Sequence, residues 1–225
     1  MQASTEIRWF FKERQEIALL EDWFMHYHLQ LNTKSFERQD YYMKLEGVTT
    51  LGLKIREPKK NAMGEWEGKL EAKVLTKEPG VSQTLNDNSG KVNQWTKFSF
   101  SLATGEKTLT EILKSLGVSD DGAPNKDFDY WITMDKSRIL LKYDLDKKDF
   151  TKGDEQIQEG CGVELTMLQL HNKIYYSFGL EAFSASGKHE ENLFVTLKHV
   201  FNEVKISGLA VENSLSYPEL LAGKI

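Results

Sequence analysis

The stretch "TEIRWFF", Thr5–Phe11, has two chemically different sides if it forms a β-strand, because alternate side chains of a strand point to opposite faces. One face is uniformly apolar and holds Ile7, Trp9 and Phe11. The other face holds Glu6, Arg8 and Phe10. The apolar face predicts a core packed against this strand, and the charged face raises the question of what a carboxylate and a guanidinium do on its other side.

The composition is ordinary for a globular protein, with 28% charged and 40% hydrophobic residues. A formal net charge of -5 argues against nucleic acid as a partner of the whole molecule. The single cysteine, Cys161, rules out an internal disulfide bond. No apolar run approaches the roughly 20 residues that span a bilayer, and the first residues lack an apolar signal core. We therefore expect a cytoplasmic protein without a membrane partner, and one domain over residues 1–225.

Two amphipathic helices are expected near the ends of the chain. The first covers "KERQEIALLEDWFMHYHLQ", residues 12–30, and the second "HEENLFVTLKHVFNEV", residues 189–204. Between them lie about seven or eight strand patterns, and the last two predict a hairpin turning at "HNK", residues 171–173. We also expect a short helix over 108–118, capped by Thr108 with Glu111, and loops over 80–94 and 120–129. This order predicts an α+β fold with an antiparallel sheet.

Inside the strands, charged and apolar residues alternate. In "TLGLKIRE", Lys54 and Arg56 oppose Leu51, Leu53 and Ile55, and five further strands behave alike. The polar faces are either the wet side of an open antiparallel sheet or the inside of a closed barrel whose apolar outside is covered by helices.

Basic residues outnumber acidic ones on these polar faces. The basic ones are Arg8, Lys54, Arg56, Lys69, Lys73, Lys97, Lys136, Arg138 and Lys142. The acidic ones are Glu6, Glu71, Asp144, Glu164 and Glu181. A cationic lining needs an anionic occupant or solvent to offset its self-repulsion, and phosphate suits guanidinium and ammonium groups. All of the basic residues except Lys69 are our candidate phosphate ligands. The candidate ligands of a Mg²⁺ or Mn²⁺ ion are Glu6, Asp144, Glu164 and Glu181.

The order of short motifs resembles the CYTH superfamily, the triphosphate tunnel metalloenzymes. The resemblance rests on "EIRWFF" before a helix, "RQDYYM", "LGLKIRE", "KLEAKVL", "KSRILLKYD", "VELTMLQL", "FGLEAF" and "LSYPELL". It places Lys54, Arg56, Lys73 and Arg138 at the family's basic positions. It implies an eight-stranded antiparallel barrel, closed or nearly closed, that binds triphosphate-containing substrates with Mg²⁺ or Mn²⁺ held by glutamates.

Four positions depart from the family pattern. The family opens with Glu-x-Glu-x-Lys, where this chain has Glu6, Arg8 and Phe10. Thr166 and Gly179 stand where further acids are usual. Arg8 should weaken a nearby metal site through like-charge repulsion.

Three hypotheses follow from these patterns. The first is a divergent metal-dependent triphosphatase or related phosphohydrolase acting on an anionic phosphorylated small molecule. The second is a catalytically inactive module that binds such a ligand. The third is a barrel for an apolar or zwitterionic ligand, which an inward-pointing Phe98 or Phe178 would reveal. A homodimer is left open by the sequence.

Overall fold

The structure is a computed structural model that describes residues 1–60, 62–63, 66–83, 87–101, 111, 114–115, 117–119 and 130–223. Its strands, in chain order, are β1 (Gln2–Phe11), β2 (Phe36–Met43), β3 (Leu51–Lys60), β4 (Trp66–Gln83), β5 (Ser89–Ser101), β6 (Trp131–Asp144), β7 (Asp149–Lys152), β8 (Glu159–Leu170) and β9 (Lys173–Ser184). Its helices are α1 (Ala18–Leu31), α3 (His189–Val204) and α4 (Tyr217–Leu221), with 3₁₀ turns at Arg14–Ile17 and Val211–Asn213.

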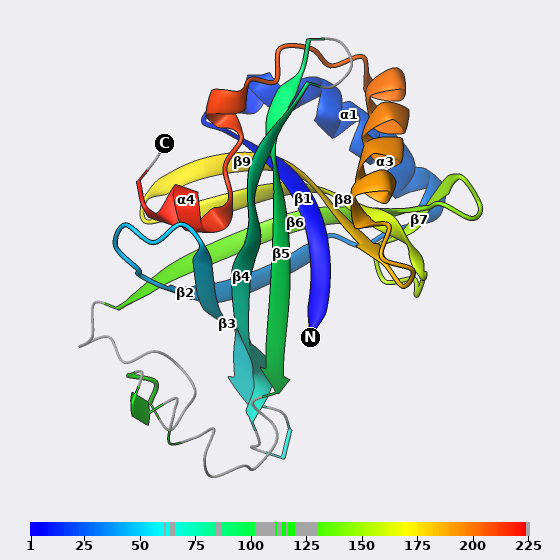
Figure 1. The fold of residues 1–225 in the computed structure, drawn as a ribbon. Helices are drawn as coiled ribbons and strands as arrows, with labels where there is room; N and C mark the ends of the chain where they lie inside the picture. Colours follow the sequence, from blue (N-terminus) through cyan, green and yellow to red (C-terminus); the bar gives the residue numbers. More distant parts are fainter. Residues whose placement is uncertain are drawn as a thin grey trace.

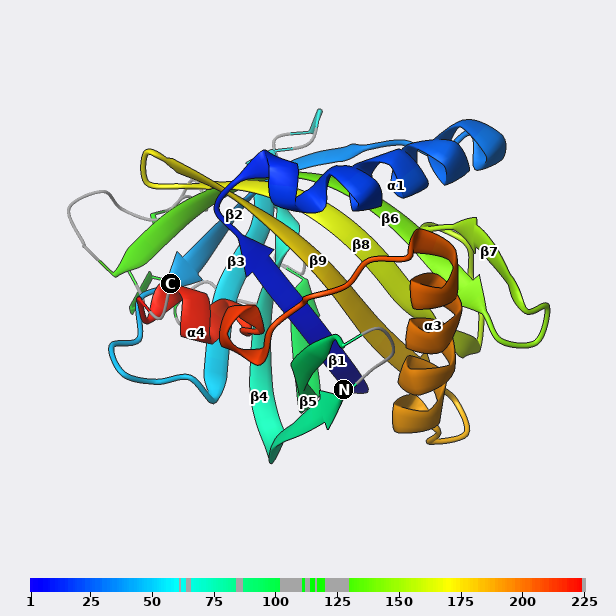
Figure 2. The same cartoon turned by 90° about the horizontal axis from the view of Figure 1, so that it is seen from above.

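The sheet closes on itself as an antiparallel barrel (Figures 1 and 2). Neighbouring strands follow the order β2-β3-β4-β5-β1-β9-β8-β6, and β6 pairs back onto β2. Strand β6 is long enough to pair with β2 over one part and with the short β7 over another. The predicted α+β fold with an eight-stranded antiparallel barrel is therefore confirmed, and the open-sheet alternative is wrong.

The apolar outer face of the barrel is covered by the two long helices, as the alternation predicts. Trp9 of β1 lies among Phe24 of α1, Phe178 of β9 and Phe201 of α3, and all four side chains are fully buried. The ring centroids of Trp9 and Phe178 are 5.9 Å apart and nearly parallel. Aromatic side chains bury large apolar areas, so this cluster fixes the helices on one side of the barrel.

A second apolar cluster fills one end of the barrel interior. It joins inward-facing residues of β1, β2, β6 and β8 to the C-terminal segment that carries α4. Its members include Phe10, Tyr42, Met134, Leu168, Leu215 and Leu220. Phe10 thus shares a face with Glu6 and Arg8 but packs against apolar neighbours, and its ring centroid lies 5.5 Å from that of Tyr217.

The loop predicted over residues 80–94 is largely wrong. Strand β4 continues to Gln83 and β5 begins at Ser89, so the two strands pair across most of this segment. A Cβ atom at Gly90 would lie 2.7 Å from both Ile7 and Trp9. The glycine here permits close packing of a strand, a role that composition alone does not separate from a loop.

Other expectations can be compared only in part. The hairpin turning after Leu170 and both long helices are confirmed. The expected helix over 108–118, with Thr108 as its cap, and the expected loop over 120–129 lie largely or wholly outside the described residues. No helix in the described part of the chain is long and apolar enough to cross a membrane.

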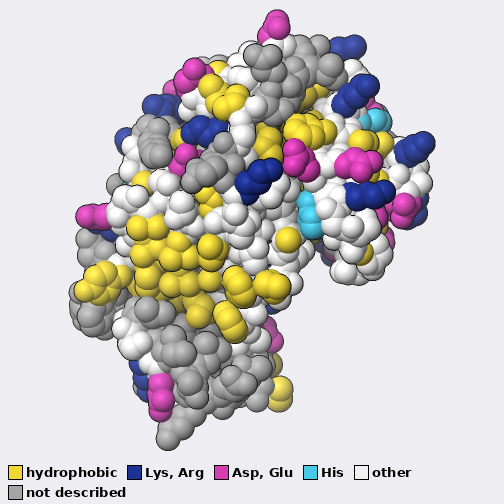
Figure 3. Space-filling view, viewed as in Figure 1, with side chains coloured by type: hydrophobic (Ala, Val, Ile, Leu, Met, Phe, Trp, Pro, Cys, Tyr) yellow, Lys and Arg dark blue, Asp and Glu magenta, His cyan; other side chains and the backbone are white. Residues whose placement is uncertain are grey.

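Apolar side chains also reach the surface of the barrel, as the space-filling view shows (Figure 3). Val74 of β4 and Phe98 and Phe100 of β5 are exposed on the outer face. The homodimer that the sequence leaves open stays a prediction.

Candidate functional site

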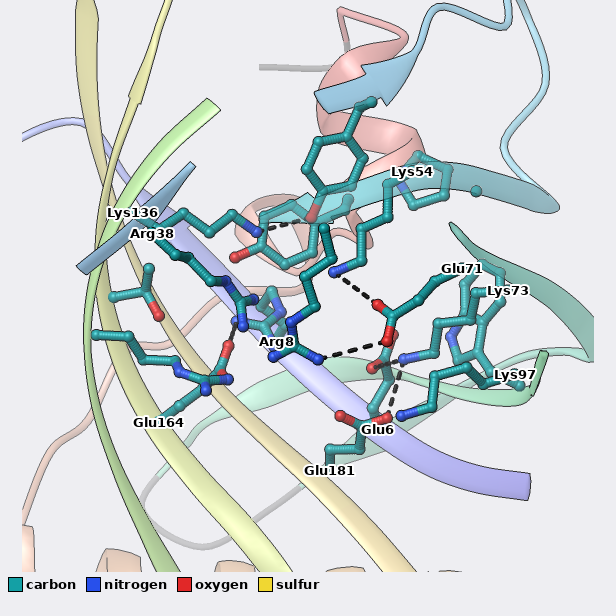
Figure 4. A pocket seen from close by; sticks show the side chains of 18 residues that line it. Glu6, Arg8, Arg38, Lys54, Glu71, Lys73, Lys97, Lys136, Glu164 and Glu181 are labelled. Atoms are coloured by element: carbon teal, nitrogen blue, oxygen red, sulfur yellow. Dashed lines mark hydrogen bonds and ion pairs between the residues drawn. The ribbon is translucent and has the colours of Figure 1, made fainter. Parts of the chain in front are cut away.

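The inward faces of the strands surround a cavity with about 840 Å³ of empty space, part of it open to solvent (Figure 4). Its basic lining residues, among those described, are Arg8, Arg38, Lys54, Arg56, Lys73, Lys97, Lys136 and Arg138. Its acidic lining residues, within the same described part, are Glu6, Glu71, Glu164 and Glu181. Alternation along the strands brings these charges together, because the apolar neighbour of each points outward to the core or the surface.

All but two of the predicted site residues line this cavity. Lys142 lies instead in an adjoining hollow that shares Lys97, Arg138 and Glu164 with the main cavity. Asp144 lies at the end of β6 beyond the closed part of the barrel. Its carboxylate accepts hydrogen bonds from the backbone N–H groups of residues 146 and 147, so it holds the β6–β7 turn and does not line the cavity. Lys69, counted among the inward charges, is exposed.

On one side of the cavity, a lysine bridges two carboxylates. Glu6 and Glu181 are register partners on β1 and β9. Lys73 Nζ from β4 lies 2.6 Å from Glu6 Oε2 and 3.1 Å from Glu181 Oε1. Lys73 lowers the pKa of Glu181 to about 2, and although burial opposes it, the two carboxylates raise the pKa of Lys73. Lys97 lies half-buried nearby and forms no hydrogen bond or ion pair with any described residue.

Arg8 forms the floor of the cavity. Its register partner on β9 is Gly179, and a Cβ atom there would lie 2.6 Å from Arg8 Cζ. Arg8 Nη1 donates to Ser177 Oγ at 3.2 Å and lies 2.5 Å from Glu164 Oε1. Arg138 binds the other oxygen of Glu164 at 3.2 Å. Burial alone would raise the pKa of Glu164, but Arg8 and then Arg138 hold it far below its ordinary value.

A third group centres on Asp40, whose side chain is fully buried. Asp40 Oδ2 lies 3.3 Å from Arg38 Nε, 3.3 Å from Lys54 Nζ and 3.7 Å from Lys136 Nζ. Lys136 Nζ also donates to the Tyr42 hydroxyl at 2.7 Å. Three cations thus share one carboxylate, although Lys54 has a second acidic partner in Glu71 at 3.2 Å.

This crowding changes the protonation of the lysines. Burial, followed by the charge of Lys54, lowers the pKa of Lys136 well below its ordinary value of 10.5. Lys136 Nζ lies 3.7 Å above the centre of the Tyr217 ring, which shields it from solvent. Burial likewise lowers the pKa of Lys54 despite its two carboxylate partners. The pKa of Asp40 is lowered, because the surrounding cations outweigh the effect of its own burial.

Sequence reasoning missed several lining residues. Arg38 and Tyr42 lie on one face of β2 with Asp40, and their spacing of two along "RQDYYM" was a usable signal. Trp95 and Tyr217 also line the cavity. Tyr217 belongs to the C-terminal segment, and no strand periodicity points to its place at the barrel.

Several buried polar atoms of the lining have no hydrogen-bond partner among the described residues. They are Arg38 Nε, Trp95 Nε1, Arg138 Nε and Thr166 Oγ1. Buried donors without partners cost free energy, and three of these four atoms are obligate donors. They therefore favour an occupant that accepts hydrogen bonds.

The residues present do not fit a Mg²⁺ or Mn²⁺ site. Glu6 and Glu181 bind Lys73, and Glu164 lies between two arginines. Within the described ranges, no group of three or more His, Cys, Asp or Glu side chains is placed to hold a metal ion. Mg²⁺ needs oxygen ligands and tolerates neighbouring cations poorly, so we assign no chemical step to a metal.

The aromatic test of the third hypothesis gives a negative result. Phe178 is fully buried in the outer core, and Phe98 is 36% exposed on the outer face, so neither lines the cavity. An apolar ligand site built from these two faces is therefore excluded.

The fold and the lining together define a closed antiparallel β-barrel with a net basic interior. No family model matches the chain, and no curated protein matches it. Among solved structures, a crystal structure of a putative adenylate cyclase from Bacillus halodurans is similar, with 14% sequence identity and a TM-score of 0.45. The match covers 95% of this chain and 96% of that chain. At this level of similarity we draw nothing from it about activity.

Proposed function

We propose that the barrel interior binds a small polyphosphorylated anion, such as a triphosphate-containing molecule. The observation that carries the proposal is the lining itself. Among the described residues it gathers eight basic side chains around four acidic ones, in a protein with a formal net charge of -5. Such a concentration of positive charge is unfavourable without an anion to offset it.

The chemistry of the lining suits phosphate oxygens. Arginine presents a planar fork of donors, and lysine contributes a compact charge, so a mixture of both can bind several phosphate groups in a row. The unpaired Lys97 and the free Nε of Arg138 supply donors that no described residue uses.

We propose binding in preference to turnover. Phosphoryl transfer depends on positioning a nucleophile and on neutralising developing charge, commonly with metal ions. Every carboxylate of the described lining is already engaged by a lysine or arginine. That leaves no carboxylate available to activate water, so the inactive module is the better supported of the first two hypotheses.

The test is calorimetric titration with tripolyphosphate, pyrophosphate, ATP and, as weak references, phosphate and sulfate at matched ionic strength. Affinity should rise with the number of phosphate groups. Lys97→Gln should weaken tripolyphosphate binding with only a small loss of stability, since Lys97 forms no ion pair with a described residue and acts on Glu71 and Glu181 only through its charge. Lys173→Gln, an exposed position on β9, is the matched control and should bind as the unmodified protein does.

The absence of saturable binding to every polyphosphate would refute the proposal. Equal binding by the Lys97 and Lys173 variants would show that any binding occurs elsewhere. Phosphate release, measured on the same samples, would favour the hydrolase hypothesis instead.

A further inference from the structure

We infer, on the basis of the proposed function, that the barrel binds its polyphosphate without a divalent metal ion. The Arg8 guanidinium supplies a fixed positive charge in the cavity, and Mg²⁺ therefore weakens binding. The ligand class is therefore the uncomplexed polyanion and not its magnesium complex. The inference comes from the disagreement between the lining and the metal that the sequence led us to expect.

The first observation is that the acidic side chains are already neutralised. Lys73 Nζ bridges Glu6 and Glu181 at 2.6 and 3.1 Å. Arg8 and Arg138 bind the two oxygens of Glu164. A divalent cation would have to displace these buried partners and would then leave them without counter-charges.

The second observation is that Arg8 is fixed in place. Its side chain is 6% exposed and donates to Ser177, and its guanidinium lies 4.9 Å from the centre of the Tyr217 ring. The guanidinium occupies the space directly above Gly179, which a side chain at that position would fill. Arginine stays charged at every accessible pH, so the floor of the cavity carries a permanent positive charge.

Bound Mg²⁺ also changes the charge of the ligand that enters the cavity. A magnesium complex of a polyphosphate carries two fewer negative charges than the free anion, and its metal would enter a cavity where basic residues exceed acidic ones. Repulsion between like charges is strong at partly buried sites, where the effective dielectric constant is well below that of water. The free anion is attracted by all of the basic side chains of the cavity. The magnesium complex is attracted less strongly, because it carries less negative charge, and its metal ion is repelled by the same side chains.

Mass action turns this argument into a measurable fold-change. If only the free anion binds, the apparent dissociation constant equals the intrinsic constant divided by the free fraction of ligand. When Mg²⁺ complexes nine tenths of the tripolyphosphate, the apparent affinity should fall about tenfold. The experiment is calorimetric titration of tripolyphosphate into the full chain with EDTA and then with graded MgCl₂, with KCl added to equalise ionic strength.

Two variants test whether Arg8, at the floor of the cavity, contributes to the binding of the metal-free anion. Arg8→Gln should reduce affinity for metal-free tripolyphosphate by at least about tenfold, since it removes a permanent charge and its charge-assisted hydrogen bonds. Arg14→Gln is the control, because Arg14 is an exposed arginine paired with Glu21 on the outer surface. The magnesium titration of the unmodified protein needs no variant, so the inference is tested even where Arg8→Gln does not fold.

Each outcome has a defined meaning. Binding that requires Mg²⁺, or an apparent affinity that stays constant or rises with Mg²⁺, overturns the inference and leaves the proposed function standing. Full affinity in folded Arg8→Gln overturns the role of Arg8. Absence of binding both with EDTA and with Mg²⁺ overturns the proposed function, and this inference with it.

Discussion

Asp40→Asn is the most direct test of how the interior charges are held. The substitution keeps the shape of the side chain and removes the one carboxylate that Arg38, Lys54 and Lys136 share. Removing one partner of a buried ion pair costs about 3–5 kcal/mol, because the remaining charge is left uncompensated. Lys136 already has a lowered pKa and can release its proton, which limits the penalty. We therefore expect a loss near the lower limit, about 3 kcal/mol.

The measurement is urea denaturation at pH 7 and low salt. Because the dependence of unfolding free energy on urea is at most about 3 kcal/mol per molar for typical small proteins, the midpoint should fall by about 1 M or more. Asp135→Asn is the matched control on the neighbouring strand. Asp135 is exposed and bonds only the side chain of Gln39 among the described residues, so its loss should stay within about 0.5 kcal/mol.

The same variant also reports on the ligand. A polyanion in the cavity can replace the missing negative charge, so tripolyphosphate should raise the midpoint of Asp40→Asn more than that of the unmodified protein. A loss below about 1 kcal/mol would refute the reasoning, because it would place the Asp40 pairs among exposed ion pairs of little worth. An equal loss in Asp135→Asn would refute it as well.

Two further predictions concern the floor and the protonation of the cavity. Gly179→Ala should lower tripolyphosphate affinity, because its Cβ would displace the Arg8 guanidinium from its place beside Glu164 and Ser177. Gly162→Ala, whose Cβ would meet only ordinary contacts from 3.5 Å, should leave affinity unchanged, and calorimetry compares the two variants. Tripolyphosphate affinity should also fall as pH rises from 7 toward 10.5. Above the lowered pKa of Lys136, this lysine is neutral in the free protein. Binding of the anion favours protonated Lys136, so each binding event must take up a proton, and this becomes less favourable as pH rises. Calorimetry in two buffers of different ionisation enthalpy measures this uptake, and Lys136→Met should reduce it; pH-independent affinity would contradict the prediction.

The alternation of side chains predicted most of the cavity lining because it is a local property. Once β1, β3 and β4 form, a period of two places Arg8, Lys54 and Lys73 on the faces opposite the apolar ones, whatever the barrel does later. From the residues alone, a closed barrel was one of two alternatives. Closure depends on the pairing of β2 with β6, which are almost a hundred residues apart. A single sequence carries no signal of such a pairing.

The partners of each charge could not be predicted in this way. Lys73 meets Glu181 across 108 residues of sequence, and Arg8 meets Glu164 only because Gly179 lies between their strands in the sheet. From the sequence we expected these groups to face one channel as separate charges, whereas in the structure they form ion pairs with one another. Asp144, predicted as a metal ligand, lies outside the cavity for a related reason. It has the inward parity of β6 but lies where that strand has left the barrel for the β7 turn.

Phe10 explains why the face shared by Glu6 and Arg8 is not charged throughout. It belongs to the apolar cluster that fills one end of the interior together with α4, and Tyr217 bridges that cluster to the cavity. The basic residues beside this ring are also the least exposed, at 6% for Arg8 and 3% for Lys136. Charges act over longer range where water is excluded, so the strongest attraction for an anion should lie at the apolar end. A phosphate chain would then place its terminal group near Arg8 and Lys136 and direct the rest of the molecule toward Lys97 and the more accessible part of the cavity.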